Sequence, residues 1–200
     1  EMMYALDEID GFEWIRLHYA HPAHLHRDMI QAYSEFKHVI PYIDMPVQHG
    51  SDRMLKRMRR GLKSEGIKNR IEALRDVNSE IAIRTSIIVG FPGETDEDFQ
   101  QLMDMIEEVK FDRLGVFTYS EEEGTTAAAD MEDDIPRHIK EERLDAVMMA
   151  QQSINLKKNK GLVGQTDKVI VDKSTDDGWT IARSYRDAPE IDNYVRINGK

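Results

Sequence analysis

The feature that most constrains the fold is an ordered succession of apolar runs, each followed by a stretch with helical spacing. Strands are predicted at 14–19, 39–45, 81–89 and 113–119. Strands that alternate with helices run parallel and are joined by right-handed crossovers, so the sequence predicts an α/β fold, either an open sheet or a barrel. The strand at 81–89 is apolar at most positions, which is typical of a central strand covered on both faces.

The C-terminal part of the chain has a different pattern. Residues 136–161 have the spacing of one long helix that begins at Pro136, with an inward face predicted at Ile139, Leu144, Val147, Met148 and Ile154. Short strands at 168–171, 179–182 and 194–197 follow, with a turn at 176–178. We therefore divide the chain into an α/β domain (1–135), a connecting helix (136–161) and a small β-domain (162–200).

Composition excludes several classes of site. The sequence contains no cysteine, so its own residues cannot form disulfides, thiolate nucleophiles or iron–sulfur ligands. No apolar run approaches the roughly 18 residues of a membrane span, and the N-terminus lacks the pattern of a signal peptide, so we expect a cytoplasmic protein without membrane contact. The histidines at 18, 21, 24 and 26 fall on different predicted elements, and no metal site is predicted.

Charge favours a basic or neutral partner. The formal net charge is -11, and residues 121–145 carry ten acidic and three basic side chains, which would repel nucleic acid. The exception is the segment from Arg53 to Lys63, with six cations in eleven residues. This segment is either a solvated helix face or a contact for RNA.

Candidate binding residues lie where the predicted strands end, because ligands of parallel α/β folds bind there. Gln48 to Ser51 could hold a nucleoside or a carboxylate, and Gly90 to Glu94 offers close backbone approach and an aromatic face for an adenine. The alternative is that Gly90 to Glu94 is an ordinary strand-to-helix connection. Arg84 and Ser86 interrupt the apolar strand, and a buried arginine needs a partner such as a ligand carboxylate.

Three ordered motifs, at 42–61, 85–95 and 117–125, resemble those of the radical S-adenosylmethionine methylthiotransferases. The resemblance covers essentially the whole chain. The segments at 14–22 and 182–192 resemble the branch that modifies a ribosomal protein rather than tRNA.

The resemblance implies the last four units of a six-unit barrel, followed by an incomplete TRAM β-domain. It implies addition of a methylthio group to the β-carbon of an aspartate in small-subunit ribosomal protein twelve. The implied cofactors are S-adenosylmethionine and two [4Fe-4S] clusters. The family's Cys-x-x-x-Cys-x-x-Cys loop is absent, so we expect a fragment that is inactive alone.

The resemblance also suggests roles for particular residues, although no catalytic residue is assigned. We expect Arg84 to face the carboxylate of S-adenosylmethionine, Gln48 and Ser86 its ribose or amino group, and Phe91 its adenine. The expected cofactor-binding set is Gln48, Ser51, Arg84, Ser86, Gly90 and Phe91. The expected substrate-binding set is Arg183, Asp187 and Glu190.

Other functions remain open on the sequence alone. One is a tRNA adenosine methylthiotransferase, and another is a non-catalytic fragment that binds the ribosome or RNA. A third is an unrelated phosphate-binding barrel enzyme that uses Gly90 to Glu94.

Overall fold

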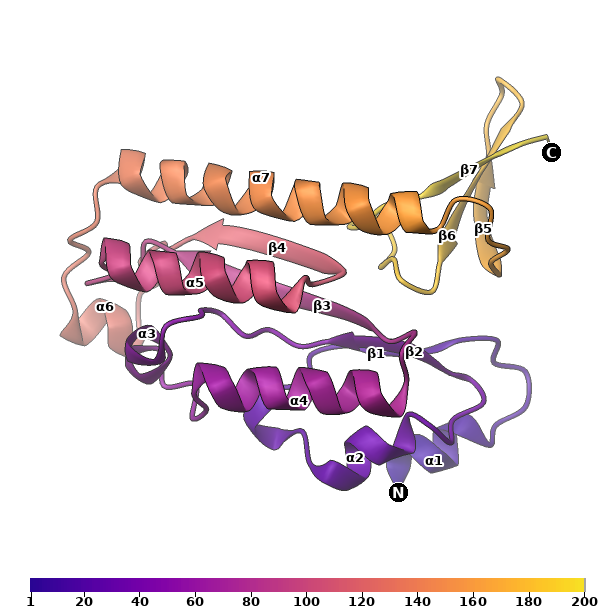
Figure 1. Cartoon of the computed structure of the whole chain (residues 1–200), viewed down its shortest axis with the longest axis horizontal. Helices are drawn as coiled ribbons and strands as arrows, with labels where there is room; N and C mark the ends of the chain where they lie inside the picture. The colour runs from indigo at the N-terminus through magenta and orange to yellow at the C-terminus, as the bar shows by residue number, and fades with distance from the viewer. Residues whose placement is uncertain (200) are drawn as a thin grey trace.

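The computed structural model describes residues 1–199 and contains two β-sheets (Figure 1). The first sheet is parallel and has the strand order β1 (Ile15–Leu17), β2 (Val39–Asp44), β3 (Ala82–Val89), β4 (Arg113–Thr118). The second is antiparallel and consists of β5 (Val169–Ser174), β6 (Trp179–Ser184) and β7 (Val195–Asn198). The predicted α/β class, with four parallel strands and a small β-unit after them, is confirmed.

Three long helices pack beside the parallel sheet (Figure 1). These are α4 (Ser64–Val77), α5 (Asp96–Val109) and α7 (Arg137–Gly161). The shorter helices are α1 (Met2–Asp7), the 3-10 helix η1 (Pro22–His24), α2 (Arg27–Ala32), α3 (Asp52–Arg57) and α6 (Thr126–Asp130). None of the helices in residues 1–199 has the length and apolar character needed to cross a membrane.

The two faces of β3 differ in burial, which corrects the expectation of a strand fully covered on both sides. Ile83, Ile87 and Val89 are completely buried and pack in one core cluster with residues of α4 and α5. The alternate residues Arg84, Ser86 and Ile88 are only half-buried. Successive side chains of a strand point to opposite faces, so these three lie on the face away from the core cluster.

We call this second face the inner face. Its members follow from strand register, because directly paired residues of parallel strands share a face. Arg84 pairs with Asp44 and Arg113, Ser86 with Gly115, and Ile88 with Phe117. Arg16 of β1 joins them, since its guanidinium carbon lies 4.1 Å from the ring centroid of Tyr42, the inner-face residue before Asp44 on β2.

Several predicted elements are shorter or packed differently. The first strand is only three residues long, and the helix between it and β2 is limited to the six residues of α2. Within α7, Met148 is 48% exposed rather than inward. Val147 is buried as predicted, and Leu144 and Ile154 pack against the core cluster. The other buried positions of this helix are the polar residues Lys140, Arg143 and Gln151.

The small sheet and the segments that follow the parallel strands lie at opposite ends of the molecule. In Figure 1 the arrowhead of β4 points toward α3 and α6, and β5 to β7 lie beyond the other end of the strands. The predicted small domain ends at Lys200, which lies outside the described residues. Ligands bound at the carboxyl ends of β1 to β4 would therefore sit far from most of the small sheet.

Candidate functional site

The segment after β2 is held against β3 by backbone and hydroxyl hydrogen bonds. The buried Thr85 hydroxyl donates to the carbonyl of Met45 at 3.0 Å and accepts from the amide of Val47 at 3.2 Å. Beyond it, the Gln48 amide donates to the Ser86 carbonyl and the Ile88 amide donates to the Gln48 carbonyl. Gln48 has φ of 74°, which is uncommon for a residue with a side chain. The parallel pairing thus continues past the end of β2 and places Gln48 opposite Ile87, with its backbone hydrogen-bonded to Ser86 and Ile88.

The rest of the Gln48–Ser51 motif is buried and joins helices. A Cβ on Gly50 would lie 2.7 Å from the Cα of Leu102 and 2.8 Å from the carbonyl oxygen of Gln101, so only glycine fits against α5. Ser51 is the N-cap of α3, and its hydroxyl donates to the Oδ1 atom of Asp98 at 2.6 Å. Of the residues from 48 to 51, only Gln48 is partly exposed.

The turn after β3 is fixed from inside by Glu94. Its buried carboxylate accepts hydrogen bonds from the amides of Gly90 and Phe91, and the Arg143 guanidinium lies 3.2 Å from its Oε1 atom. Gly90 has φ of 69°, a conformation that suits glycine. The ring of Phe91 is 7% exposed and packs edge-on against Tyr119. Phe91 therefore does not present the open aromatic face that the sequence suggested.

The same turn is also fixed from outside. Arg53 donates to the carbonyl of Gly93 at 2.6 Å, and Arg57 donates to the carbonyl of Pro92 at 3.1 Å. From the acidic segment after β4, Asp134 accepts from the amide of Gly93 at 2.6 Å. Two arginines of the basic segment 53–63 thus stabilise the turn after β3, which we call the frame of the site together with Ser51, Glu94, Asp98 and Arg143.

Asp98 joins α3 to the start of α5. Burial alone would raise the pKa of its carboxyl, but hydrogen bonds from Arg53, Ser51 and Thr95 outweigh burial and hold the pKa well below its usual range. Thr95 and Asp98 also form a capping box at the N-terminus of α5. The carboxylate is therefore ionised at neutral pH and serves as a fixed structural anion.

Arg84 occupies the middle of the inner face between two carboxylates. Its Nη1 atom lies 3.2 Å from Oδ1 of Asp44, and its Nε atom lies 3.7 Å from Oδ2 of Asp192. The side chain is 13% exposed, and the Nε atom is buried without a hydrogen-bond partner among the described residues. Toward the carboxyl end of the strands, the residues of the inner face are apolar, namely Gly115, Ile88 and Phe117.

The predicted cofactor residues therefore divide into two groups. Gln48, Arg84 and Ser86 are partly exposed neighbours on β3 or beside it. Ser51, Gly90 and Phe91 are buried and form the frame beneath them. The amide, hydroxyl and guanidinium of the first group are donors of the kind that a carboxylate or a ribose accepts, whereas the second group shapes the site through the backbone.

Iron–sulfur clusters find no ligands in this chain. Cysteine is absent from the sequence, and within residues 1–199 no group of three or more His, Asp or Glu side chains is placed to hold a metal ion. His21 and His24 have ring centroids 4.9 Å apart, but the Nδ1 atom of His21 accepts a hydrogen bond from the amide of Ala23. Any cluster chemistry would therefore need ligands from outside this sequence.

The predicted substrate residues lie at the end of the molecule that carries the small sheet. Arg183 pairs with Asp172 at 2.9 Å, and Glu190 is exposed with φ of 63°. The expected acidic surface needs a correction at Asp187, which is 3% exposed because its carboxylate accepts hydrogen bonds from Arg113 and Ser184. Sequence reasoning missed this contact because the paired residues are far apart in the chain.

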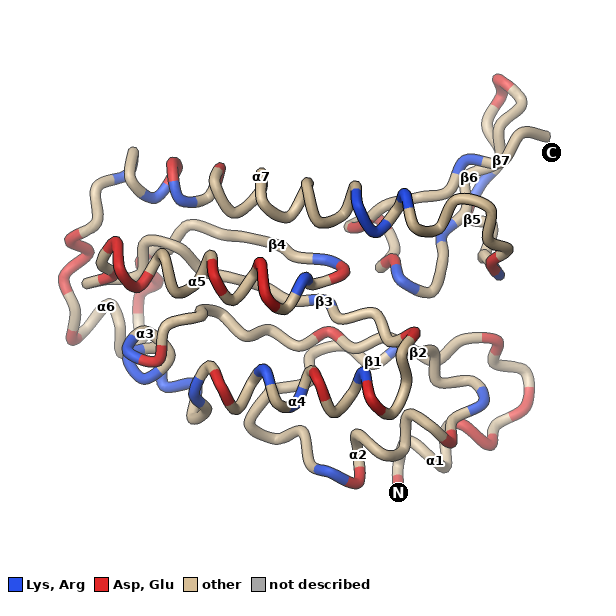
Figure 2. Tube along the Cα trace, in the orientation of Figure 1, with Lys and Arg blue, Asp and Glu red and all other residues tan. Residues whose placement is uncertain are grey.

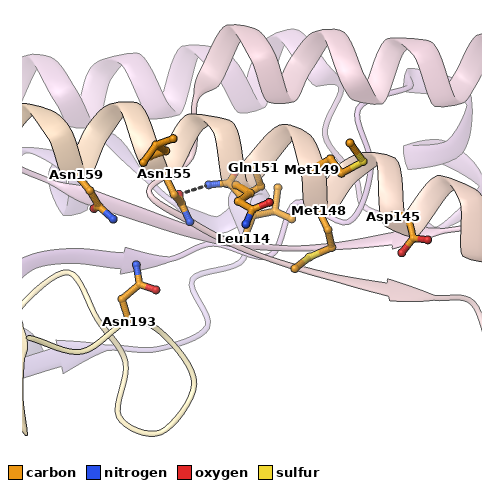
Figure 3. Close-up of a pocket in the computed structure, with 10 residues that line it drawn as sticks. Leu114, Asp145, Met148, Met149, Gln151, Asn155, Asn159 and Asn193 are labelled. Carbon is orange, nitrogen blue, oxygen red and sulfur yellow. Dashed lines mark hydrogen bonds between the residues drawn. The ribbon is translucent and has the colours of Figure 1, made fainter.

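Two grooves lie outside this frame. One, of about 620 Å³, is bordered by the exposed cations Arg53, Lys56, Arg59 and Lys63. Figure 2 shows Lys and Arg gathered at α3. The other, of about 600 Å³, runs between α7 and β4 and is lined by apolar and amide groups that include Met148, Asn155 and Asn193 (Figure 3). None of the predicted cofactor residues lines either groove.

Comparison with known proteins gives two domain matches in chain order. Residues 1–106 match the radical SAM superfamily, and residues 163–200 match the TRAM domain. The structure is also similar to coproporphyrinogen III oxidase (HemN) from Escherichia coli, described as a radical SAM enzyme, with a TM-score of 0.56. That likeness covers 88% of this chain and 45% of the other at 16% identity, and it bears on the fold alone.

Sequence relatives are similar over nearly the whole chain. A ribosomal protein uS12 methylthiotransferase RimO from Thermosipho africanus is 46% identical over 200 residues, which are 100% of this chain and 46% of the relative. The protein of the same name from Prosthecochloris aestuarii is 46% identical over 94% of this chain and 43% of its own length. The chain thus spans less than half the length of these relatives.

Proposed function

Because this chain belongs to the radical SAM superfamily, we propose that it forms the barrel and TRAM part of a ribosomal protein uS12 methylthiotransferase. The observation that carries the proposal is 46% identity to a relative of that name across both matched domains. The reaction would add a methylthio group to the β-carbon of an aspartate in uS12. Since ribosomes are its target, we place the activity in the cytoplasm.

The chain's own residues would bind and orient S-adenosylmethionine. When bound, this cofactor supplies the carbon radical and the methyl group of such a reaction. Gln48 and Ser86 would contact its polar groups, and Arg84 its carboxylate, from one side of the inner face. The frame of Glu94, Asp98 and Arg143 would keep the Gly90–Gly93 turn in one conformation. Catalytic residues and cluster ligands would lie in the longer protein.

We also propose that the basic groove contacts RNA near the substrate protein. Lys56, Arg59 and Lys63 are exposed there, and positive side chains bind phosphates without regard to sequence. This surface is also the observation that favours the second candidate, a tRNA adenosine methylthiotransferase. Because the chain as a whole is acidic, we expect uS12, a basic partner, to bind more tightly than tRNA.

Competition binding tests the substrate assignment. A full-length protein carrying this sequence is titrated with uS12 and, separately, with a tRNA anticodon arm at several salt concentrations. We expect uS12 to bind more tightly, with affinity that falls as salt rises. Charge reversal of Glu190 should weaken uS12 binding, whereas Glu72→Lys, which reverses an exposed acid of α4 that lies away from the basic groove, provides the control. Tight binding of the anticodon arm without binding of uS12 would support the tRNA reading instead.

A further inference from the structure

Arginines from three parallel strands converge on one loop of the small sheet. The loop comprises residues 185–192, between β6 and β7. Arg16 of β1 donates to the carbonyl of Asp187 at 2.9 Å, and the Nε atom of Arg113 of β4 donates to its carboxylate at 2.8 Å. Arg84 of β3 faces Asp192. The loop therefore covers the inner face near the amino ends of the strands.

The loop is folded by the same carboxylates that face the arginines. Asp187 Oδ2 accepts from the hydroxyl of Ser184 at 2.7 Å, and Asp192 Oδ2 accepts from the amide of Ala188 at 2.9 Å. Ala188 is 3% exposed, and the Tyr185 hydroxyl donates to the carbonyl of Glu80 at 2.8 Å. These contacts fix the position of Asp192 relative to the parallel sheet.

Asp192 has a specific effect on Arg84. The guanidinium has Asp44 on its Nη1 side and Asp192 on its Nε side, so the two acids set its orientation from two directions. A buried cation needs compensating charge, and Nε has no other polar partner among residues 1–199. Without Asp192, only the carboxylate of Asp44 would face the guanidinium, which could then rotate about its Cδ–Nε bond.

We propose that Asp192 is a positioning residue that sets the orientation of Arg84 on the inner face, so that docking of the small domain determines the geometry of the ligand-binding face. The effect on cofactor binding rests on the proposed function, in which Arg84 contacts the cofactor. The effect of Asp192 on the orientation of Arg84 does not depend on that function. The two parts can therefore be tested separately.

The first measurement follows Arg84 directly. In the 15N-labelled chain, the Nε–H signal of Arg84 is assigned by its loss in Arg84→Gln, and its hydrogen exchange is compared in Asp192→Asn and Asp192→Glu. We expect the signal to shift and exchange faster in the Asn variant and to stay protected in the Glu variant. Asp172→Asn, which removes an ion pair elsewhere in the small sheet, should leave the signal unchanged.

The second measurement is calorimetric binding of S-adenosylmethionine to the full-length protein carrying each variant. Loss of a buried charged contact is costly, so Asp192→Asn should weaken binding by about tenfold, and Asp192→Glu should restore most of the affinity. Melting temperatures recorded for all variants identify any loss of folding. If Asp192→Asn unfolds, Asp192→Ser, whose hydroxyl can still accept the hydrogen bond from the Ala188 amide, replaces it in both measurements.

The outcomes separate the two proposals. An Arg84 Nε–H signal that is unchanged in Asp192→Asn would overturn the positioning role. Weaker cofactor binding in Arg84→Gln but not in Asp192→Asn would also overturn it. If neither variant changes the affinity while the signal shifts, the assignment of Arg84 to the cofactor site is wrong, and Asp192 still positions Arg84.

Discussion

Single carboxylates fix several connections of this fold. Asp7 at the end of α1 accepts hydrogen bonds from the amides of Lys37, His38 and Val39 at 2.7 to 2.8 Å and so attaches the N-terminal helix to the start of β2. Burial would raise its pKa, but these hydrogen bonds lower it below the usual value. Asp98 and Glu94 act in the same way at the other end of the sheet. Such residues are structural despite their resemblance to catalytic acids.

Asp98 should make stability depend on pH. Its folded-state pKa lies below the unfolded value of 3.8, so its contribution is fully present above that value and is lost as pH falls toward the folded pKa. We expect the free energy of unfolding to decrease from about pH 5 downward and to decrease less steeply in Asp98→Asn. Urea unfolding at several pH values measures this. Equal slopes in the two proteins would contradict it.

Gly50 should tolerate no side chain. A Cβ at this position would meet backbone atoms of α5 at 2.7 and 2.8 Å, and overpacking of this kind typically costs about 1–3 kcal/mol. We expect Gly50→Ala to lower the free energy of unfolding by that amount in urea denaturation. Gly161→Ala is the matched control, because a Cβ there meets nothing within 4 Å. Equal stability of the two variants would refute the packing argument.

At the scale of elements, α7 is held by buried polar side chains. Lys140 donates to the carbonyl of Tyr119 and to Asp133, and Gln151 donates to the carbonyl of Phe111. Arg143 contacts Glu94 and Asp96. This helix therefore connects the ends of β3 and β4 to the start of α5 through buried polar contacts in addition to the apolar packing of Leu144, Val147 and Ile154.

Removal of Arg143 should be far more damaging than removal of an exposed partner on the same helix. Arg143→Met leaves Glu94 as a buried charge without its ion-pair partner, and breaking such a pair costs about 3–5 kcal/mol. Arg137→Met breaks only an exposed pair with Glu141, so it should change the free energy of unfolding little. Thermal and urea unfolding compare the two variants. A double variant with Glu94→Gln should recover part of the loss.

Sequence patterns predicted the parallel strands, α4, α5 and the extent of α7, because these elements follow apolar periodicity or capping signals. They predicted the apolar positions Leu144, Val147 and Ile154 of α7 but not its buried polar residues, since Lys140 and Arg143 are buried through partners on other segments. The same limit hid the Asp187–Arg113 pair. The roles of Gln48, Arg84 and Ser86, and the domain limits at 135 and 161, stay predictions.

At the scale of the whole molecule, the candidate binding residues and the loop of the small sheet lie toward opposite ends of the parallel strands. Gln48 and Ser86 lie toward the carboxyl ends of the parallel strands, whereas the loop at 185–192 covers the inner face from the other end. The cofactor would thus approach from the end near α3, where the basic groove also lies. Contact with the ribosome through that end would bring a substrate close to the cofactor site.

The most direct test of the proposed function is product analysis. A full-length protein carrying this sequence, with its clusters reconstituted, is incubated with S-adenosylmethionine, a reductant and an equal mixture of uS12 and tRNA. Mass spectrometry then locates any methylthio group. We predict that the group appears on one aspartate of uS12 and that Arg84→Gln reduces its yield. Modification of tRNA adenosine with unmodified uS12 would contradict the account.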